Sequence, residues 1–301
     1  MYDHKLNISI CICTFKRPDL LKKLLFHLLG QKDDELYYFN IIVVDNDFNM
    51  SAKQTVEAFI STSKLRTRYF CEPRKNIALA RNKAIQNADG ELVVFIDDDE
   101  IPSAAWLTTM VRCFLDRHCD GVLGPVIPKF VATPPNWILR SNIFDRPDPQ
   151  TGSIISPKDM RTGNVLLKRN IFKGDQNPFK PELGITGGED VEFFERMTKG
   201  GHKFIWCHEA AAFELIAKER LAIDYHLRRA INRGKARALI DPLISLPTIK
   251  SLFAFIIYFF FLPFTIFGGL SLFNKYLIRL CDHSGRIIGH LRNAWQKLRI
   301  R

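Results

Sequence analysis

The chain lacks the cysteine patterns of a zinc or redox site. Its seven cysteines occur singly, apart from the Cys-Ile-Cys of Cys11 and Cys13, so there is no CxxC motif and no Cys/His spacing suited to zinc. We expect all seven thiols to be reduced, in a cytoplasmic setting. The first residues also lack the basic start, apolar run and small-residue cleavage site of a signal peptide, so we expect no cleaved leader.

Two common nucleotide-binding motifs are absent as well. There is no GxxxxGK[ST] sequence, which excludes a P-loop enzyme, and no GxGxxG follows the first expected strand, so a dinucleotide site is unsupported. No low-complexity tract, heptad run or 20–50-residue repeat is visible. The composition, 47% hydrophobic and 25% charged, is that of an ordinary folded protein.

Net charge is absent from most of the chain and concentrated at its end. Residues 1–217 hold 28 Lys/Arg and 28 Asp/Glu, whereas residues 218–301 hold 15 basic and 4 acidic residues. The whole net charge of +11 therefore lies in the last 84 residues. We expect no nucleic-acid partner for the first part and a different partner for the basic tail.

Apolar strand-like runs alternate with helical patterns over the first two thirds of the chain. This alternation predicts an α/β fold with a mainly parallel sheet and helices on both faces. The proline-rich residues 128–160 are expected to form a long irregular loop. The expected strands are 8–15, 40–46, 66–72, 91–97, 121–126, 162–169, 203–207 and 210–216, and the expected helices begin at Pro18 and lie near 51–63, 76–88, 103–117 and the end of 184–201.

Carboxylates cluster where the fourth expected strand ends. The apolar run ELVVFID leads directly into Asp98, Asp99 and Glu100, and packed carboxylates repel unless a positive partner is near. Asp97 and Asp99 at a strand end suit Mg²⁺ or Mn²⁺, and the alternative is a solvated acidic turn. In parallel sheets ligands bind beyond the carboxyl ends of the strands, so we expect the site there.

A second acidic pair, Glu189 and Asp190, follows the glycine-rich residues 184–188. A separate carboxylate of this kind can deprotonate an incoming hydroxyl group, which contributes roughly 10²–10⁴ in rate. The alternative is that acidic side chains at a helix N-terminus are simply favoured by the helix dipole.

These motifs, taken in order, resemble those of the inverting family 2 glycosyltransferases with the GT-A fold, a Rossmann-like α/β fold. The similarity covers about residues 7–237 and is greatest to the bacterial branch that builds exopolysaccharide and lipopolysaccharide sugars. It rests on ISICICTFKRPDLLKKLL, IIVVDND, NIALARNKAI, ELVVFIDDDEIPSAAWL, TGNVLLKR, GGEDVEFFERMTKGG and AAAFELIAKERLAIDYHLRRAINRG.

The resemblance implies a role for each matching residue. The nucleotide-sugar site would comprise Thr14, Arg17, Asp45, Arg81, Asp97 and Asp98. Asp99 would be the direct metal ligand, with Asp97 near the ribose or the metal. Asp190 would be the catalytic base and Glu189 its neighbouring carboxylate. Two alternatives remain open: Asp45 as an ordinary turn residue, and Arg81 as a surface helix residue paired with a carboxylate.

The implied reaction is metal-dependent and inverting. A sugar would pass from a nucleotide-diphosphate donor to a hydroxyl of a glycan acceptor in cell-surface polysaccharide synthesis, and we expect this acceptor to be lipid-linked. The sequence departs from many family members in two ways: Glu214 replaces a histidine, and the QxxRW motif is absent. The absence of QxxRW favours addition of one sugar per encounter. There are two alternative functions. One is a nucleotidyltransferase, which would require a glycine-rich loop after the first strand, and the other is a membrane-bound pseudoenzyme scaffold.

The tail is predicted to attach to a membrane. Residues 251–274 contain no charged residue, and this segment is long enough to span about 30 Å of hydrocarbon. A turn at Pro263 or at Gly268 and Gly269, however, favours a re-entrant or interfacial segment over a span. Residues 275–301 are expected to form an amphipathic helix on an anionic membrane surface. The expected domains are 1–217, 218–250 and 251–301, at the cytoplasmic face of a bacterial inner membrane.

Overall fold

The computed structural model describes residues 4–31 and 35–299, with side chains as far as residue 295. The chain forms two compact units, each described here by itself. Unit 1 comprises Met1–Lys129, Arg146–Ile185 and Glu189–Leu215, and unit 2 comprises Phe130–Asp145, Thr186–Gly188 and Ile216–Arg301.

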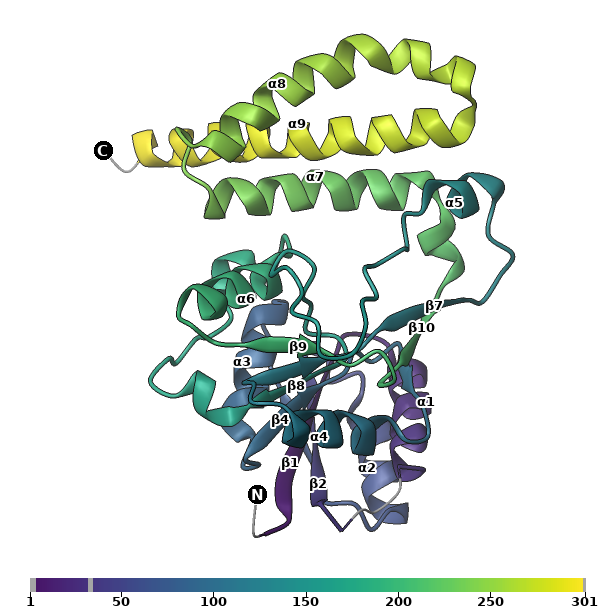
Figure 1. Cartoon of the computed structure of the whole chain (residues 1–301), viewed down its shortest axis with the longest axis vertical. Coiled ribbons are helices and arrows are strands. Elements are labelled where there is room, and N and C mark those ends of the chain that lie inside the picture. The colour runs from purple at the N-terminus through teal and green to yellow at the C-terminus, as the bar shows by residue number, and fades with distance from the viewer. Residues whose placement is uncertain (1–3, 32–34, 300–301) are drawn as a thin grey trace. The chain divides into compact units, whose positions relative to one another are not determined.

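A seven-stranded sheet forms the centre of unit 1 within the described residues, in the order β3-β2-β1-β4-β8-β6-β9 (Figure 1). Four of the neighbouring pairs are parallel, and β8 runs antiparallel to both β4 and β6. The mainly parallel sheet is therefore confirmed. The strands are β1 (Leu6–Thr14), β2 (Tyr37–Asp45), β3 (Thr67–Cys71), β4 (Leu92–Phe95), β6 (Gly121–Leu123), β8 (Val165–Lys168) and β9 (Phe204–Trp206).

Helices cover both faces of this sheet, as predicted. Helices α1 (Pro18–Leu29), α2 (Lys53–Thr62) and α4 (Trp106–Asp116) pack on one face, and α3 (Ile77–Asn87) and α6 (Glu189–Lys199) pack on the other. The strand period of two explains the division, because alternate residues of β1 enter different cores. Ile10 and Ile12 join the first core, whereas Cys11 joins the second.

Two expected strands end earlier than their apolar runs. Strand β4 ends at Phe95, so Asp97 lies in the turn that follows. The run 121–126 breaks at Gly124 and Pro125, and the chain continues as β7 (Val126–Phe130). Strands β5 (Glu100–Pro102), β10 (Ala212–Ile216) and β7 form a separate three-stranded sheet in the order β5-β10-β7. Glu100 at the end of the carboxylate run therefore begins a strand.

The prediction of an irregular loop at 128–160 is wrong in part. The segment contains the short helix α5 (Asn136–Ser141). Pro135 precedes the helix in an extended conformation, and Asn142 ends it at a φ of 54°, a left-handed conformation that asparagine tolerates. Residues typical of turns therefore lie at both ends of this helix, and the proline content of the segment led to the prediction of an irregular loop. The single-turn 3₁₀ helices are η1 (Arg169–Phe172), η2 (Pro181–Leu183) and η3 (Lys218–Leu221).

Unit 2 is helical over most of its length. It contains α7 (Ile223–Ile240), α8 (Leu246–Phe261), η4 (Leu262–Gly268) and α9 (Leu270–Arg299), with α9 between α7 and α8 (Figure 1). Ser245 caps α8 by accepting a hydrogen bond from Thr248 N at 3.4 Å. The chain reverses at Gly269, whose φ of 88° suits glycine. The expected helix at 275–301 begins five residues earlier, at Leu270.

Candidate active site

The carboxyl ends of β1 and β4 bring four of the predicted residues together. The Thr14 hydroxyl donates to Asp98 Oδ2 at 2.7 Å. Arg17, just before α1, uses Nη1 to reach Asp98 Oδ1 and Asp99 Oδ2, each at 3.1 Å. Because Pro18 starts α1 immediately after Arg17, the guanidinium group is held close to the end of β1. Arg17 is thus one positive partner of the carboxylate run.

Burial disfavours the ionised forms of this run. Asp99 is 8% exposed, and burial together with the charges of Asp97 and Asp98 raises its pKa to about 7, although Arg17 opposes the shift. Burial also raises the pKa of Asp98, against the stabilising contacts from Arg17 and Thr14. One arginine therefore compensates the cluster incompletely, and a further cation would be favoured there.

Glu100 orients the turn that carries these carboxylates. The backbone N–H of Asp97 donates to Glu100 Oε2 at 3.1 Å, and the N–H of Glu100 donates to the Asp97 carbonyl at 3.0 Å. Glu100 is buried, and burial raises its pKa well above the ordinary value. The side chain of Asp97 remains 45% exposed.

Glu214 lies beside the same turn from the other sheet. It is paired with Glu100 in the antiparallel β5–β10 register, and the next residue, Leu215, donates its N–H to the Asp99 carbonyl at 2.8 Å. Arg146 Nη2 lies 3.3 Å from Glu214 Oε2. The carboxylate at the position of the family histidine therefore adjoins the acidic turn, and Arg146 balances its charge.

Arg81 joins the two acidic motifs into one site. This buried side chain of α3 donates from Nη1 to Glu189 Oε1, and its Nη2 lies 3.8 Å from Asp97 Oδ1. The helix is fixed by Asn76, whose side chain accepts from Leu79 N at 3.2 Å. Burial raises the pKa of Glu189 and Arg81 opposes this, so the pair is a charge-compensated buried contact.

Asp190 lies at the start of α6, beside Glu189. Its Oδ1 accepts a hydrogen bond from Val191 N at 2.8 Å, and its Oδ2 lies 3.9 Å from Arg161 Nε. The side chain of Asp190 is 16% exposed, whereas that of Glu189 is 6% exposed. Of the two acidic residues, Asp190 is the one that solvent or a substrate hydroxyl can reach.

Asp45 lies apart from these contacts, at the end of β2. It is fully buried, and both of its oxygens accept hydrogen bonds within the chain: from Asp47 N at 3.1 Å, from Ala52 N at 2.7 Å and from the Tyr69 hydroxyl at 3.0 Å. In the structure, Asp45 therefore anchors the loop of residues 47–52.

Sequence reasoning missed Gly163, which lines the acidic turn, and its buried neighbour Thr162. A Cβ on Gly163 would lie 2.5 Å from Glu100 Oε1 and 3.0 Å from Asp97 Oδ2, so the backbone approaches these carboxylates as closely as glycine permits. Thr162 is buried, and its hydroxyl has no hydrogen-bond partner among the described residues. The Thr-Gly-Asn sequence before β8 was the available signal, since an isolated glycine at a strand start indicates a close approach.

The residues at the turn fit a divalent cation that is shared with a substrate. Among the described residues, no group of three or more His, Cys, Asp or Glu side chains forms a complete ligand set. Mg²⁺, however, is usually bound by one or two carboxylates and by substrate phosphates. Asp97 and Asp99 provide such oxygens. The pKa of Asp99 is raised first by burial and then by the negative charges of Asp97 and Asp98, and a bound cation would oppose both effects.

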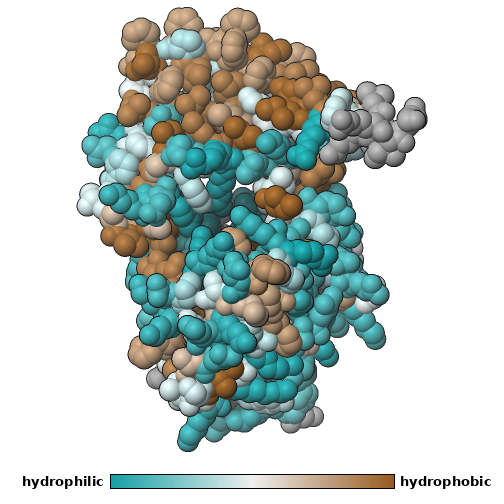
Figure 2. Space-filling view, turned by 180° about the vertical axis from the view of Figure 1, so that it is seen from behind, coloured by the Kyte–Doolittle hydropathy of each residue, from teal (hydrophilic) through white to brown (hydrophobic). Residues whose placement is uncertain are grey.

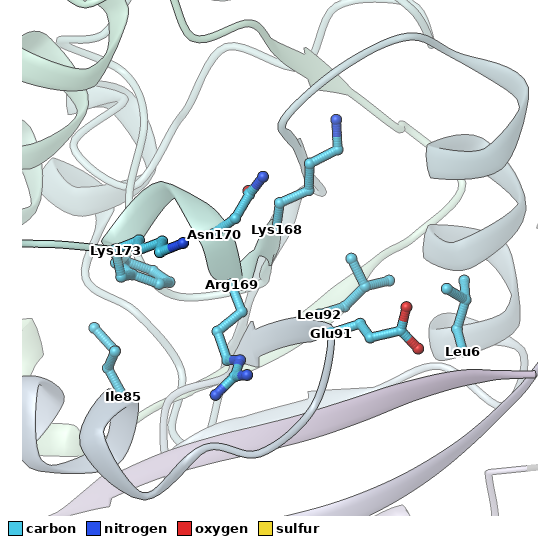
Figure 3. A pocket seen from close by; sticks show the side chains of 9 residues that line it. Leu6, Ile85, Glu91, Leu92, Lys168, Arg169, Asn170 and Lys173 are labelled. Atoms are coloured by element: carbon cyan, nitrogen blue, oxygen red, sulfur yellow. The ribbon is translucent and has the colours of Figure 1, made fainter.

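A cavity of unit 1 lies apart from this site. A pocket of about 750 Å³ opens near the start of β1 and β4, at the opposite end of these strands from Thr14 and the acidic turn (Figure 3). Two of its three cationic side chains are engaged within the chain: Lys168 Nζ lies 3.2 Å from Asp120 Oδ1, and Arg169 Nη1 donates to the Ala88 carbonyl at 3.0 Å. The pocket carries none of the predicted site residues.

Comparisons with known proteins agree with this architecture. Residues 9–175 match the model of the family described as Glycosyl transferase family 2. The succinoglycan biosynthesis protein ExoM of Rhizobium meliloti is 32% identical over 238 residues, which are 78% of this chain and 75% of that protein.

Two solved structures share the fold at lower identity. The Pyrobaculum calidifontis mannosyltransferase PcManGT, in complex with GDP-Man and Mn²⁺, has a TM-score of 0.66 at 16% identity, covering 98% of this chain and 89% of that one. S. aureus TarS, in complex with UDP, has a TM-score of 0.56 at 15% identity, covering 97% and 92%. With the match to the family model and the identity to ExoM, these likenesses identify the chain as a glycosyltransferase of family 2.

Proposed function

We propose that this glycosyltransferase is metal-dependent and inverting, and that it transfers a sugar from a nucleotide-diphosphate donor to a hydroxyl of a lipid-linked glycan. The reaction would serve cell-surface polysaccharide synthesis at the cytoplasmic face of a bacterial inner membrane. The observation that carries the proposal is the contact of Arg81 with both Asp97 and Glu189. This contact joins the carboxylate turn, where the donor would bind, to the Glu189–Asp190 pair, which contains the proposed catalytic base.

The donor would bind at the carboxyl ends of β1 and β4. Thr14, Arg17, Arg81, Asp97 and Asp98 surround the acidic turn and would contact the nucleotide sugar. Asp45 would act through the loop that it anchors. Asp99, with Asp97, would hold Mg²⁺ or Mn²⁺, which supplies charge stabilisation for a departing diphosphate when bound. Arg17 would exchange part of its contact with Asp99 for contact with the phosphates.

The acceptor would approach from the α6 side of the site. Asp190 takes the proton of the acceptor hydroxyl, and the hydroxyl oxygen bonds to the anomeric carbon of the sugar. The bond from that carbon to the diphosphate oxygen breaks, and its electron pair leaves with the nucleotide diphosphate. The configuration inverts because the displacement is single and in line. Glu189, held by Arg81, would fix the start of α6 and thereby position Asp190.

Named relatives support the substrate classes. A structural neighbour was solved with GDP-Man and Mn²⁺, another with UDP, and the sequence relative ExoM is named for succinoglycan biosynthesis. The acceptor class is inferred from the tail, because an apolar segment beside the transferase would place the enzyme where lipid-linked sugars are found.

Nucleotide-binding calorimetry on detergent-purified protein tests the donor site. UDP, GDP, CDP and dTDP would each be titrated with and without Mn²⁺. We expect one diphosphate to bind in a metal-dependent manner and Asp99→Ala to abolish this binding. Asp175→Ala, on the surface of unit 1, serves as the control. Absence of binding by all four would remove the donor site and favour a pseudoenzyme scaffold.

Transfer activity tests the base. With the donor that calorimetry identifies and a lipid-linked glycan preparation as acceptor, Asp190→Asn is expected to lower the rate by about 10²–10⁴ while nucleotide affinity stays unchanged. Glu192→Gln is the matched control, because Glu192 lies in the same first turn of α6 but pairs with Arg196 at 3.0 Å. Full activity of Asp190→Asn would refute the mechanism.

A further inference from the structure

An extended apolar surface covers α8 and η4 in unit 2. Leu246–Gly268 is long and apolar enough to cross a membrane, and only 11% of its apolar window is buried. Figure 2 shows hydrophobic residues gathered over this part of the molecule, at the top of the view. We call this surface the apolar face. Its exposed members are Leu252, Phe253, Ile256, Ile257, Phe259, Phe260, Phe261, Phe264, Ile266, Phe267 and Leu270.

The helix α8 exposes its apolar side, whereas a surface helix of a soluble protein exposes its polar side. Two polar side chains within its apolar part face α9: Ser251 Oγ lies 2.8 Å from His283 Nδ1, and the Tyr258 hydroxyl accepts from Arg279 Nη1 at 2.8 Å. Phe260, by contrast, is 66% exposed on the outside. A soluble protein buries the apolar side of an amphipathic helix, so this orientation indicates an apolar medium outside α8.

Cationic side chains border the apolar face. Lys250 lies at the start of α8, Lys275 lies near the start of α9, and both are exposed. Residues 245–281 contain Lys250, Lys275 and Arg279 and no acidic residue. An apolar surface whose bordering charges are mainly cationic complements lipid chains beneath anionic headgroups, and the nearby Asp282 is paired with Arg233. A second protein copy would bring the same positive charges together, which disfavours self-association through this face.

The turn at Gly269 limits how deeply the segment can insert. The chain reverses there and returns as α9, which packs along α8 through the Ser251 and Tyr258 contacts. The return limb meets its first charge at Lys275, six residues after Gly269, or about 9 Å along a helix. The hydrocarbon core of a bilayer is about 30 Å thick, so this depth corresponds to less than one leaflet.

We propose that the apolar face inserts into a single leaflet of an anionic bilayer, so that α8, η4 and α9 form a one-sided hairpin and do not span the membrane. This inference deepens the membrane part of the proposed function, on which it rests, and it involves none of the residues of the transfer reaction. The chain on either side of the hairpin would then lie on the same side of the membrane.

Vesicle flotation of the full chain tests the apolar face. With vesicles of phosphatidylethanolamine and phosphatidylglycerol, we expect the double variant Phe260→Glu/Phe264→Glu to bind at least tenfold more weakly. Phe26→Glu, at a residue 71% exposed on α1, is the matched control and should bind as the unaltered chain does. Lys250→Gln and Lys275→Gln should each weaken binding about fivefold, and only to anionic vesicles. Equal binding by the Phe260→Glu/Phe264→Glu variant and the control would overturn the assignment of the face.

Protease accessibility in sealed proteoliposomes tests the one-sided hairpin. Tags at the two chain ends should be cleaved together in every vesicle population. Cleavage of one tag with protection of the other would establish a span and overturn the proposal, as would dimerisation through this face without vesicle binding. Mn²⁺-dependent nucleotide binding, measured on the same preparation, keeps the outcomes separate. Loss of vesicle binding with intact nucleotide binding would refute the hairpin alone, whereas the reverse would refute the proposed transferase site.

Discussion

Replacing Asp99 with asparagine is expected to stabilise unit 1 at neutral and higher pH when neither metal nor nucleotide is present. Burial raises the pKa of Asp99 from 3.8 to about 7. Between these two pH values the unfolded chain has released the proton that the folded chain still holds. The folded state then binds more protons, so its free energy of unfolding falls as the pH rises from about 4 to about 7. Asparagine has no such proton and removes this dependence.

The size of the effect follows from the same shift. A rise of about three pH units corresponds to about 4 kcal/mol, at about 1.36 kcal/mol for each unit. This shift already includes the opposing contact of Arg17 with Asp99, so no separate loss is subtracted for it. We therefore expect Asp99→Asn to gain up to about 4 kcal/mol at pH 8, and to lose that advantage at pH 4.

Asp120 provides a control of opposite sign. Burial acts to raise its pKa, but hydrogen bonds from Lys203 N, Lys168 and His202 overcome this and lower it. The stability it contributes is therefore present above its ordinary pKa and is lost as the pH falls. Asp120→Asn should destabilise unit 1 at pH 8, whereas Asp99→Asn should stabilise it.

Urea unfolding followed by tryptophan fluorescence measures both variants from pH 4 to pH 8. With Trp137→Phe and Trp295→Phe in the background, the remaining Trp106 and Trp206 both belong to unit 1. A difference between Asp99→Asn and the unaltered protein that does not change with pH would refute the account of burial. So would destabilisation of Asp99→Asn at pH 8.

Three further predictions concern packing and the site. Arg81→Met leaves Glu189 buried without its guanidinium partner and should cost about 3–5 kcal/mol in urea unfolding, partly recovered by adding Glu189→Gln; no recovery would show that the pair is unimportant. Gly285→Ala places a Cβ against the α7 backbone and should destabilise unit 2 by about 1–3 kcal/mol, measured by the unfolding of its helices; an unchanged transition would contradict the tight packing. Gly163→Ala should weaken Mn²⁺-dependent nucleotide binding about tenfold in calorimetry, because its Cβ would crowd the carboxylates, and unchanged affinity would exclude a ligand at this turn.

Local sequence patterns predict much of unit 1. The apolar run of β2 and its end at Asp45 follow from burial on both sides of a parallel sheet. Pro18 marks the start of α1 because its fixed φ suits the first helical turn. These signals are local, so they identify elements and bring Thr14 and the acidic turn to the same end of the sheet.

Partners far apart in sequence could not be predicted from such patterns. The contact of Arg81 with Glu189 joins residues 108 positions apart, and no periodicity of either helix encodes it. The same holds for β8, whose antiparallel insertion between β4 and β6 depends on the whole topology. The run 251–274 indicated an apolar segment, but the inward direction of Ser251 and Tyr258 required the position of α9.

The positive partner of the carboxylate run also became visible only in the structure. Two arginines fulfil part of this role, since Arg17 contacts Asp98 and Asp99 while Arg81 contacts Asp97. The pKa of Asp99 is nevertheless raised to about 7, first because the carboxyl group is buried and then because Asp97 and Asp98 carry like charges, and Arg17 opposes this only in part. Burial and the neighbouring carboxylates therefore both disfavour the ionised form of Asp99 in the folded chain. A site that is under-compensated while its partner side chains are already in place is one that gains free energy when a cation arrives with its substrate.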